Sequence, residues 1–353
     1  MTDDAGAIGH RGSATGGRVR LGLVGAGYIG RFHAETIARR LPDADLFVVA
    51  DPAGDAARDL AGRFGAESSA DPADVVESSD LDGVVIAAPA RFHADLVVGA
   101  AEAGKAVFCE KPMALVLPDA NRAIAAAEAA GVPLQVGFQR RFAADFRAAG
   151  EAVRAGAIGT PQLLRSLTRD PGLADPGRVP PWTIFRETLI HDFDVLLWLN
   201  PGAAPVSVFA MADALVAPAF KANGLLDTSV VLIRFDGGAM GVAEASFSAS
   251  YGYDVRAEAF GSAGMVTTGA QERSAMRLYS DAGMTQETVR ANTDLFFDAY
   301  TAELAHFVEC IRTGATPSVT GRDARGALAV ALAAMESVRT GGPVDVEAVE
   351  AGA

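Results

Sequence analysis

A glycine-rich turn between a strand-like and a helix-like segment constrains the fold of this chain more than any other feature. Residues 19–24 are apolar, residues 25–30 read G-A-G-Y-I-G, and a helical pattern follows. In that setting Gly25 permits a tight turn, Gly27 lets the backbone approach a pyrophosphate, and Gly30 lets the helix and strand pack closely. The pattern predicts a dinucleotide-binding turn, because the strand before it and the helix after it supply the required context.

The segment after the turn supports the same prediction. A helix is expected from about residue 29 to residue 40, so the N–H groups of Tyr28 and Ile29 would face the phosphates. A second strand, residues 46–50, ends in Asp51, 21 positions after the last glycine of the turn. A carboxylate there accepts hydrogen bonds from the adenosine ribose and repels a 2′-phosphate, which predicts NAD rather than NADP. The alternative is a turn residue before a proline.

Strand-like and helix-like segments continue to alternate through the first part of the chain. Helices are expected at 56–64, 74–78, 92–103 and 118–130, and strands at 81–87, 107–109 and 134–137. Repeated βα units predict a parallel, doubly wound sheet, a Rossmann domain over residues 19–138. Ala88 and Pro89 end one strand and are expected beside the nicotinamide or its ribose. His93, in the first turn of the next helix, is a candidate cofactor neighbour or a residue with a structural hydrogen bond.

One strand of this half ends in an acid, a lysine and a proline: Glu110, Lys111 and Pro112. The chain has only three lysines, and the carboxyl end of a strand is where α/β folds bind ligands. Lysine can serve there as a point charge or a proton donor. The alternative is a solvated Glu-Lys pair. We predict that Glu110 and Lys111 lie beside the cofactor and that Lys111 is catalytic.

The second half of the chain has a different pattern, in which most of the predicted elements are strands. Strands are expected at 162–168, 206–214, 228–235, 239–250, 254–261, 264–268 and 275–279, with helices at 143–155, 301–312 and 322–339. Turns at residues 236–238 and 261–264 predict hairpins, and hairpins imply a large, mostly antiparallel sheet. The predicted division is a disordered tail at 1–18, the Rossmann domain, an α+β domain for substrate and oligomerisation at 139–321, and a C-terminal helix and tail at 322–353.

A predicted helix at residues 185–199 carries polar side chains among apolar ones. Glu187 and His191 are four positions apart and share one helix face. A histidine beside a carboxylate exchanges a proton near neutral pH, so both are candidate catalytic residues. The alternatives are an ordinary surface pair and, for Asp192 and Asp194, a solvated face. If Glu187 lies against His191, it should raise the pKa of the imidazole.

Bulk properties exclude several classes of protein. A chain of 353 residues suggests two domains, and a net charge of −14 with a pI near 4.8 argues against nucleic-acid or anionic-membrane binding. No signal peptide or membrane span is expected. Cys109 and Cys310 lack metal-ligand spacing, and we expect both to be buried and reduced in a cytoplasmic protein.

The motifs together resemble one family of oxidoreductases. The glycine turn, the segments 110–112 and 137–142, and the helix from Glu187 onward occur in the order found in the Gfo/Idh/MocA family. Segments 169–171, 188–194 and 251–254 are most similar to those of inositol 2-dehydrogenases. The position of Glu187 is usually an aspartate in that family, so this chain departs from the family pattern there.

The resemblance implies NAD(P)-dependent oxidation of a ring hydroxyl on a sugar or cyclitol. It implies that Lys111 holds the hydroxyl oxygen and the cofactor ribose, and that His191 is the general base. It further implies a substrate pocket, no metal, and a homodimer or homotetramer built through the large sheet. The residues expected to line that pocket are Lys111, Gln139, Arg140, Asp170, Glu187, His191 and Tyr253.

Three functions are compatible with these features. The first is an NAD-dependent inositol 2-dehydrogenase or a close cyclitol dehydrogenase. The second is a pyranose, anhydrosugar or glycoside dehydrogenase of the same family. The third is a non-catalytic NAD-binding sensor, against which the presence of both Lys111 and His191 argues.

Overall fold

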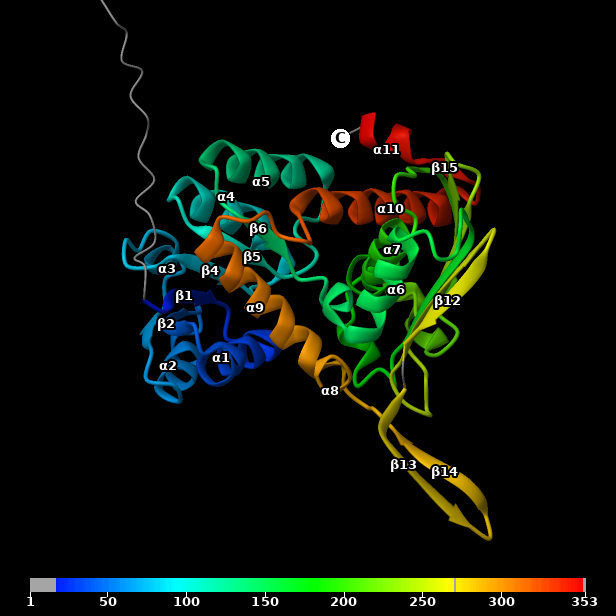
Figure 1. Ribbon diagram of the computed structural model, residues 1–353, viewed down its shortest axis with the longest axis horizontal. Helices are drawn as coiled ribbons and strands as arrows, with labels where there is room; N and C mark the ends of the chain where they lie inside the picture. The colour runs from blue at the N-terminus through cyan, green and yellow to red at the C-terminus, as the bar shows by residue number, and fades with distance from the viewer. Residues whose placement is uncertain (1–16, 270, 352–353) are drawn as a thin grey trace, which may run out of the picture.

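The computed structural model describes residues 17–269 and 271–351. Most of the predicted disordered tail, residues 1–16, lies outside the described residues. The described part contains two large sheets with helices packed on them and one two-stranded sheet (Figure 1). No helix in this part is long and apolar enough to cross a membrane.

The first sheet is parallel, has six strands and follows the order β3-β2-β1-β4-β5-β6, which confirms the predicted doubly wound sheet. Its strands are β1 (Val19–Val24), β2 (Ala44–Ala50), β3 (Glu67–Ser69), β4 (Gly83–Ile86), β5 (Ala106–Cys109) and β6 (Leu134–Val136). The strand order reverses between β1 and β4, so their carboxyl ends form the crevice in which such folds bind ligands.

Successive side chains of the buried strands enter two different apolar cores, as the two-residue repeat of a strand requires. Val84 and Ile86 face one core, whereas Val85 between them faces the other. The helices of this half are α1 (Tyr28–Arg40), α2 (Gly54–Gly62), α3 (Ala73–Val76), α4 (His93–Glu102) and α5 (Leu117–Ala130), with a short turn η1 (Ala90–Phe92). Both faces of the sheet are therefore covered, and the ligand crevice at the strand ends remains accessible.

The second sheet has seven strands in the order β12-β11-β7-β10-β9-β8-β15. All neighbouring pairs are antiparallel except β7 with β10, which confirms the predicted mostly antiparallel sheet. The strands are β7 (Pro161–Arg169), β8 (Pro205–Asp213), β9 (Thr228–Phe235), β10 (Met240–Ser246), β11 (Asp254–Gly261), β12 (Gly264–Thr268) and β15 (Val344–Asp345).

Helices cover only one face of this sheet. They are α6 (Ala144–Arg154), α7 (Leu189–Trp198) and α10 (Gly321–Thr340), and Figure 1 shows them on the side of the sheet that faces the first domain. Short segments complete this half: η2 (Gln139–Phe142), η3 (Pro176–Arg178), the π-helix η4 (Ile184–Thr188), η5 (Pro218–Asn223) and α11 (Val346–Ala351). The opposite face carries no helix of the described residues.

Two segments extend away from the second sheet. The hairpin of β13 (Glu272–Ser280) and β14 (Gly283–Thr288) projects away from the sheet (Figure 1). After α8 (Asn292–Leu295), helix α9 (Phe297–Thr313) returns to the first domain, where its Leu304 and Phe307 join the core that contains Phe108. The predicted division, which counts α9 with the second domain, does not capture this contact.

Candidate active site

The glycine turn forms a cradle at the N-terminus of α1. Gly25 has a φ of +107°, which favours glycine, and a Cβ at Gly30 would collide with the Gly25 carbonyl oxygen. A Cβ at Gly27 would point into open space, where no atom lies within 4 Å. No side chain caps the helix after Gly27, so its first N–H groups are free for an anion. The turn therefore fits the pyrophosphate of a dinucleotide.

Asp51 is held rigidly beside this turn, at the end of β2. Its Oδ2 accepts a hydrogen bond from the Ala26 N–H at 2.7 Å, and its Oδ1 accepts from the Ala53 N–H at 2.8 Å. The nearest arginine downstream, Arg58, is paired with Asp55 at 2.7 Å on the exposed side of α2. The Asp51 carboxylate therefore lies where the adenosine ribose is expected. The guanidinium of Arg31 also reaches the turn, where it donates to the Ala26 carbonyl oxygen at 3.0 Å.

Two residues predicted as cofactor neighbours, His93 and Glu110, bond to the protein itself, and for His93 this is the structural alternative. His93 is 1% exposed, and its ring nitrogens lie 2.8 Å from the Pro112 carbonyl oxygen and 2.7 Å from that of Ala88. The carboxylate of Glu110 is buried and contacts His33 and the backbone of Lys111. Both side chains thus hold the ends of β4 and β5 in place and do not face the cofactor crevice. Sequence position alone could not distinguish these roles.

A cavity of about 800 Å³ lies beside the crevice and gathers nearly all predicted substrate residues. Its lining includes Tyr28, Lys111, Gln139, Asp170, Glu187, His191 and Tyr253. Thr168, Asn292 and Tyr300 also line it, and these three were not predicted. Asn292 and Tyr300 come from the segment of α8 and α9, whose return to the first domain had no signal in the sequence. Tyr28 reaches that segment, because its hydroxyl lies 2.9 Å from Thr293 Oγ1.

Lys111 and Glu187 form a pair inside the cavity. The Lys111 ammonium donates to the Glu187 carbonyl oxygen at 3.0 Å and lies 3.2 Å from its carboxylate Oε2. The predicted helix at 185–199 is split: residues Ile184–Thr188 form a π-helical turn, and α7 begins at Leu189. Such wide turns are frequent at functional sites. The predicted Glu187–His191 pair is therefore corrected, because Glu187 contacts Lys111 instead.

The environment of His191 also differs from the prediction. The ring is 7% exposed, and its Nδ1 is buried without a hydrogen-bond partner among the described residues. Burial lowers the pKa of His191 well below its ordinary value, and the positive charges of Lys111 and Arg140 lower it further. The expectation that Glu187 raises this pKa is wrong. His191 is consequently a neutral imidazole at physiological pH and is able to accept a proton.

Arg140 lies beneath the cavity and does not line it, which corrects its predicted contact with substrate. It is 1% exposed and donates to Asp192 Oδ1 at 2.8 Å and to Thr168 Oγ1 at 2.6 Å. Ser166 and Thr168 donate to the same carboxylate. Removing one partner of such a buried pair typically costs about 3–5 kcal/mol. This network fixes β7 against α7 directly below His191.

The neighbouring Arg141 makes a second buried pair. It contacts both carboxylate oxygens of Asp194, which is fully buried. Arg141 also donates to Asp323 at the start of α10, 3.1 Å away. A solvated face for Asp192 and Asp194, the alternative suggested by sequence, is therefore wrong. Both acids instead lock α7 to the segment that follows the first domain.

Asp170 and Tyr253 place further titratable groups on the cavity wall. Burial raises the pKa of Asp170 to about 6, against the opposing effect of Arg140 and Lys111. Burial and the nearby charge of Asp170 raise the pKa of the Tyr253 phenol, so this hydroxyl stays protonated and can donate a hydrogen bond. The cavity thus offers hydrogen-bond donors and acceptors suited to a polyhydroxylated ligand.

Comparison with known proteins agrees with this geometry. Residues 19–138 match the family model of the GFO_IDH_MocA oxidoreductases with an NAD-binding Rossmann fold, and residues 146–267 match the GFO/IDH/MocA C-terminal domain. The chain is 37% identical to scyllo-inositol 2-dehydrogenase (NAD(+)) of Bacillus subtilis (strain 168), over 94% of this chain and 97% of that one. It is 36% identical to myo-inositol 2-dehydrogenase of Thermotoga maritima, over 94% and 99% of the two chains.

A solved structure is similar over the same extent. The scyllo-inositol dehydrogenase of Lactobacillus casei, crystallised with bound NAD(H) and scyllo-inositol, matches with a TM-score of 0.89 and 28% identity, over 94% of this chain and 99% of that chain. The two family models together cover more than half of the sequence. The chain therefore belongs to the Gfo/Idh/MocA family of NAD-binding oxidoreductases.

Proposed function

We propose that this protein is an NAD-dependent cyclitol dehydrogenase that oxidises a ring hydroxyl of an inositol to a ketone. The observation that carries the proposal is the meeting of Lys111 and a neutral His191 on one polar cavity beside the dinucleotide crevice. The relatives named as inositol dehydrogenases supply the substrate class. NADH formation with myo-inositol, scyllo-inositol, glucose and levoglucosan tests it, and the inositols should be the best substrates.

His191 and Lys111 act on different atoms of the substrate hydroxyl group. When bound, NAD accepts a hydride from the carbon that bears this hydroxyl. Neutral His191 takes the hydroxyl proton as general base. An ammonium has three N–H donors, and Glu187 occupies two directions around Lys111. The third donor is left for the substrate oxygen, whose developing negative charge it stabilises.

The walls of the cavity orient the ring. Asp170 accepts hydrogen bonds from ring hydroxyls when it is ionised, and Gln139 and Tyr253 offer donors beside it. Glu187 holds Lys111 through both its carbonyl oxygen and its carboxylate. The side chain of glutamate is one methylene longer than that of aspartate, and this length lets the carboxylate reach the ammonium. Substrate discrimination then depends on which hydroxyls meet these fixed groups.

The first prediction concerns the choice of cofactor. Because Asp51 is fixed beside the glycine turn, a 2′-phosphate would face its carboxylate, whereas Arg31 is bound to the Ala26 carbonyl oxygen and Arg58 to Asp55. We expect kcat/KM to favour NAD over NADP by about 1–3 kcal/mol, the scale of a badly paired charged group. Replacing Asp51→Ala should reduce this preference, whereas Asp59→Ala, an exposed control on α2, should not. Equal use of NADP by the wild-type enzyme would contradict the assignment of Asp51.

The second prediction concerns pH. Below about 6, Asp170 takes up a proton and loses its capacity to accept hydrogen bonds with both oxygens. The pKa of His191 is lowered well below its ordinary value, so its protonation should contribute little near this midpoint. We therefore expect kcat/KM to fall below a midpoint near pH 6, and Asp170→Asn to flatten this limb of the pH profile. The exposed Asp175→Asn serves as control. If kcat/KM of Asp170→Asn still falls below about pH 6, the titration of another group must cause the fall.

We also propose that the protein is a homodimer or homotetramer that associates through the uncovered face of the second sheet. This face and its edges carry large exposed apolar side chains, namely Met211, Val230, Leu232, Met240, Phe260 and Met265. Large apolar side chains exposed on one face of a sheet are typical of association sites, and here charged neighbours lie among them, such as Glu244 opposite Val230 and Arg234 opposite Met240. Light scattering that finds only a monomer at working concentration would contradict this assembly.

A further inference from the structure

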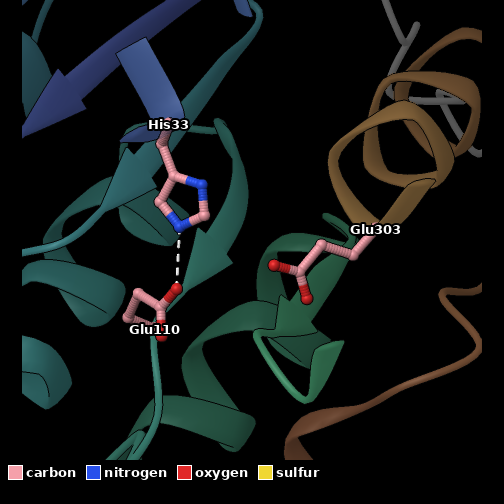
Figure 2. A group of neighbouring side chains, drawn as sticks. All are labelled: His33, Glu110 and Glu303. Carbon is pink, nitrogen blue, oxygen red and sulfur yellow. Dashed lines mark hydrogen bonds and ion pairs between the residues drawn. The ribbon is translucent and has the colours of Figure 1, made fainter. Parts of the chain in front are cut away.

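Three titratable side chains that the proposed mechanism does not use meet between α1, β5 and α9. His33 and Glu303 are fully buried, and Glu110 is 6% exposed. One ligand-type atom from each lies within 4.8 Å of the others. Figure 2 shows the Glu303 carboxylate directed toward the hydrogen-bonded pair of His33 and Glu110. None of the three lines the substrate cavity, although Glu110 directly precedes Lys111.

The surroundings of this cluster are apolar and aromatic. The His33 ring packs edge-on against Phe108 at a centroid distance of 5.5 Å and against Tyr300 at 6.0 Å. Phe307, one turn after Glu303 on α9, packs against Phe108 at 5.9 Å. An ionised carboxylate in such surroundings is costly unless a cation or several donors compensate it.

The hydrogen bonds of the cluster are unevenly distributed. Glu110 Oε1 lies 2.7 Å from His33 Nε2, and Glu110 Oε2 accepts from the Lys111 N–H at 3.2 Å. Among the described residues, neither carboxylate oxygen of Glu303 has a partner, and neither does His33 Nδ1. Gln135 Nε2 donates at 2.7 Å, but only to the backbone carbonyl of Glu303. Among the described residues, the cluster thus contains an unpaired carboxyl group and an unpaired ring nitrogen.

Groups around the cluster stabilise the negative charge of the Glu110 carboxylate but not that of Glu303. Although burial opposes it, the hydrogen bond from His33, with the charge of Lys111, lowers the pKa of Glu110. Burial, and then the charge of Glu110, raise the pKa of Glu303 well above its ordinary value. Tyr300 also faces the cluster, and its phenol is neutral because burial raises its pKa. Two adjacent buried acids of this kind share one proton.

We propose that Glu303 is a neutral carboxylic acid in the working enzyme and acts as a positioning residue for Glu110 and Lys111. Its O–H is a donor for the unpaired His33 Nδ1 or for the Glu110 carboxylate, and a small side-chain rotation or one bridging water closes the remaining gap. Once Nδ1 accepts, His33 must donate through Nε2 to Glu110. Glu110 then carries the only negative charge and holds the backbone of Lys111 beside the cofactor helix α1.

The kinetic test compares two substitutions of Glu303, and it rests on the proposed dehydrogenase activity. Glu303→Gln keeps the shape and a donor group, so kcat and the pH profile should stay within about threefold of wild type. Glu303→Leu removes the donor and should lower kcat by roughly tenfold or more, with little change in NAD affinity, because a buried acceptor is left unpaired. Glu309→Gln, an exposed change on the same helix, is the control.

A second test of the proposal, by infrared spectroscopy, does not depend on any substrate. At about pH 8, far above the ordinary pKa of a glutamate, the infrared spectrum of the wild-type protein should contain a protonated-carboxyl band that is absent from Glu303→Gln. Absence of this band from wild type overturns the proposal even if the enzyme is active. A pH midpoint that moves by about one unit in Glu303→Gln overturns it too, because a charge would then have been lost. Stoichiometric divalent metal that Glu303→Gln releases would identify the cluster as a cation site instead.

Discussion

Replacing Lys111→Ala is expected to lower kcat by about 10²–10⁴-fold, the range typical of a positioned acid–base group. The side chain supplies the only ammonium on the cavity wall formed by the described residues, and its two contacts with Glu187 aim the remaining donor at the substrate. NAD affinity should change little, because we expect the pyrophosphate at the glycine turn and the adenosine ribose at Asp51. Steady-state kinetics together with NAD titration by fluorescence separate these two effects.

A matched surface change provides the control for this experiment. Lys221 pairs with Asp213 at 2.7 Å on the exposed side of the second domain, so Lys221→Ala removes a lysine without touching the cavity. It should leave kcat and the affinity for NAD unchanged. Turnover near the wild-type level in Lys111→Ala would mean that Glu110, Lys111 and Pro112 are only the end of a strand.

Replacing His191→Ala should lower kcat by a similar factor, about 10²–10⁴, because it removes the general base. The neutral imidazole is the reactive form, and its lowered pKa keeps it neutral throughout neutral and alkaline pH. The loss should therefore be constant across that range, and a full pH profile of the variant measures it. Fluorescence titration should show nearly unchanged NAD affinity.

A different pH dependence would contradict this role of His191. If the wild-type profile rises through a midpoint near 7 that His191→Ala abolishes, the histidine titrates with an ordinary pKa and is not held neutral by burial. If His191→Ala lowers kcat only slightly at every pH, another group on the cavity wall must accept the hydroxyl proton.

The sequence predicted the architecture well because the fold depends on local patterns. The glycine turn, the apolar strands and the hairpin turns each specify their own geometry, so both sheets follow from them. The short strands β3 and β15 were missed, since three and two residues carry no readable periodicity. The π-helical turn at Ile184–Thr188 was also missed, because its residues have the apolar repeat of an ordinary helix.

The candidate site was predicted less completely, for a physical reason. Lys111 and Glu187 are 76 positions apart, and Arg140 and Asp192 are 52 apart, so no local pattern reveals either pair. The spacing of Glu187 and His191 indicated a shared face but not which partner each residue finds. Burial of charged residues depends on such distant partners, which is why Arg140 was placed on the cavity wall instead of beneath it.

The most direct test of the central claim is the transfer of deuterium from inositol to NAD. The enzyme is incubated with NAD and an inositol deuterated at every ring carbon, and the nicotinamide C4 position of the product is observed by NMR. The account predicts deuterated NADH, equimolar ketone, and no product with Lys111→Ala over the same time. If no inositol isomer yields NADH while a pyranoside or anhydrosugar does, the cyclitol assignment is wrong. If no polyol yields NADH although NAD binds, the protein is a sensor and not a dehydrogenase.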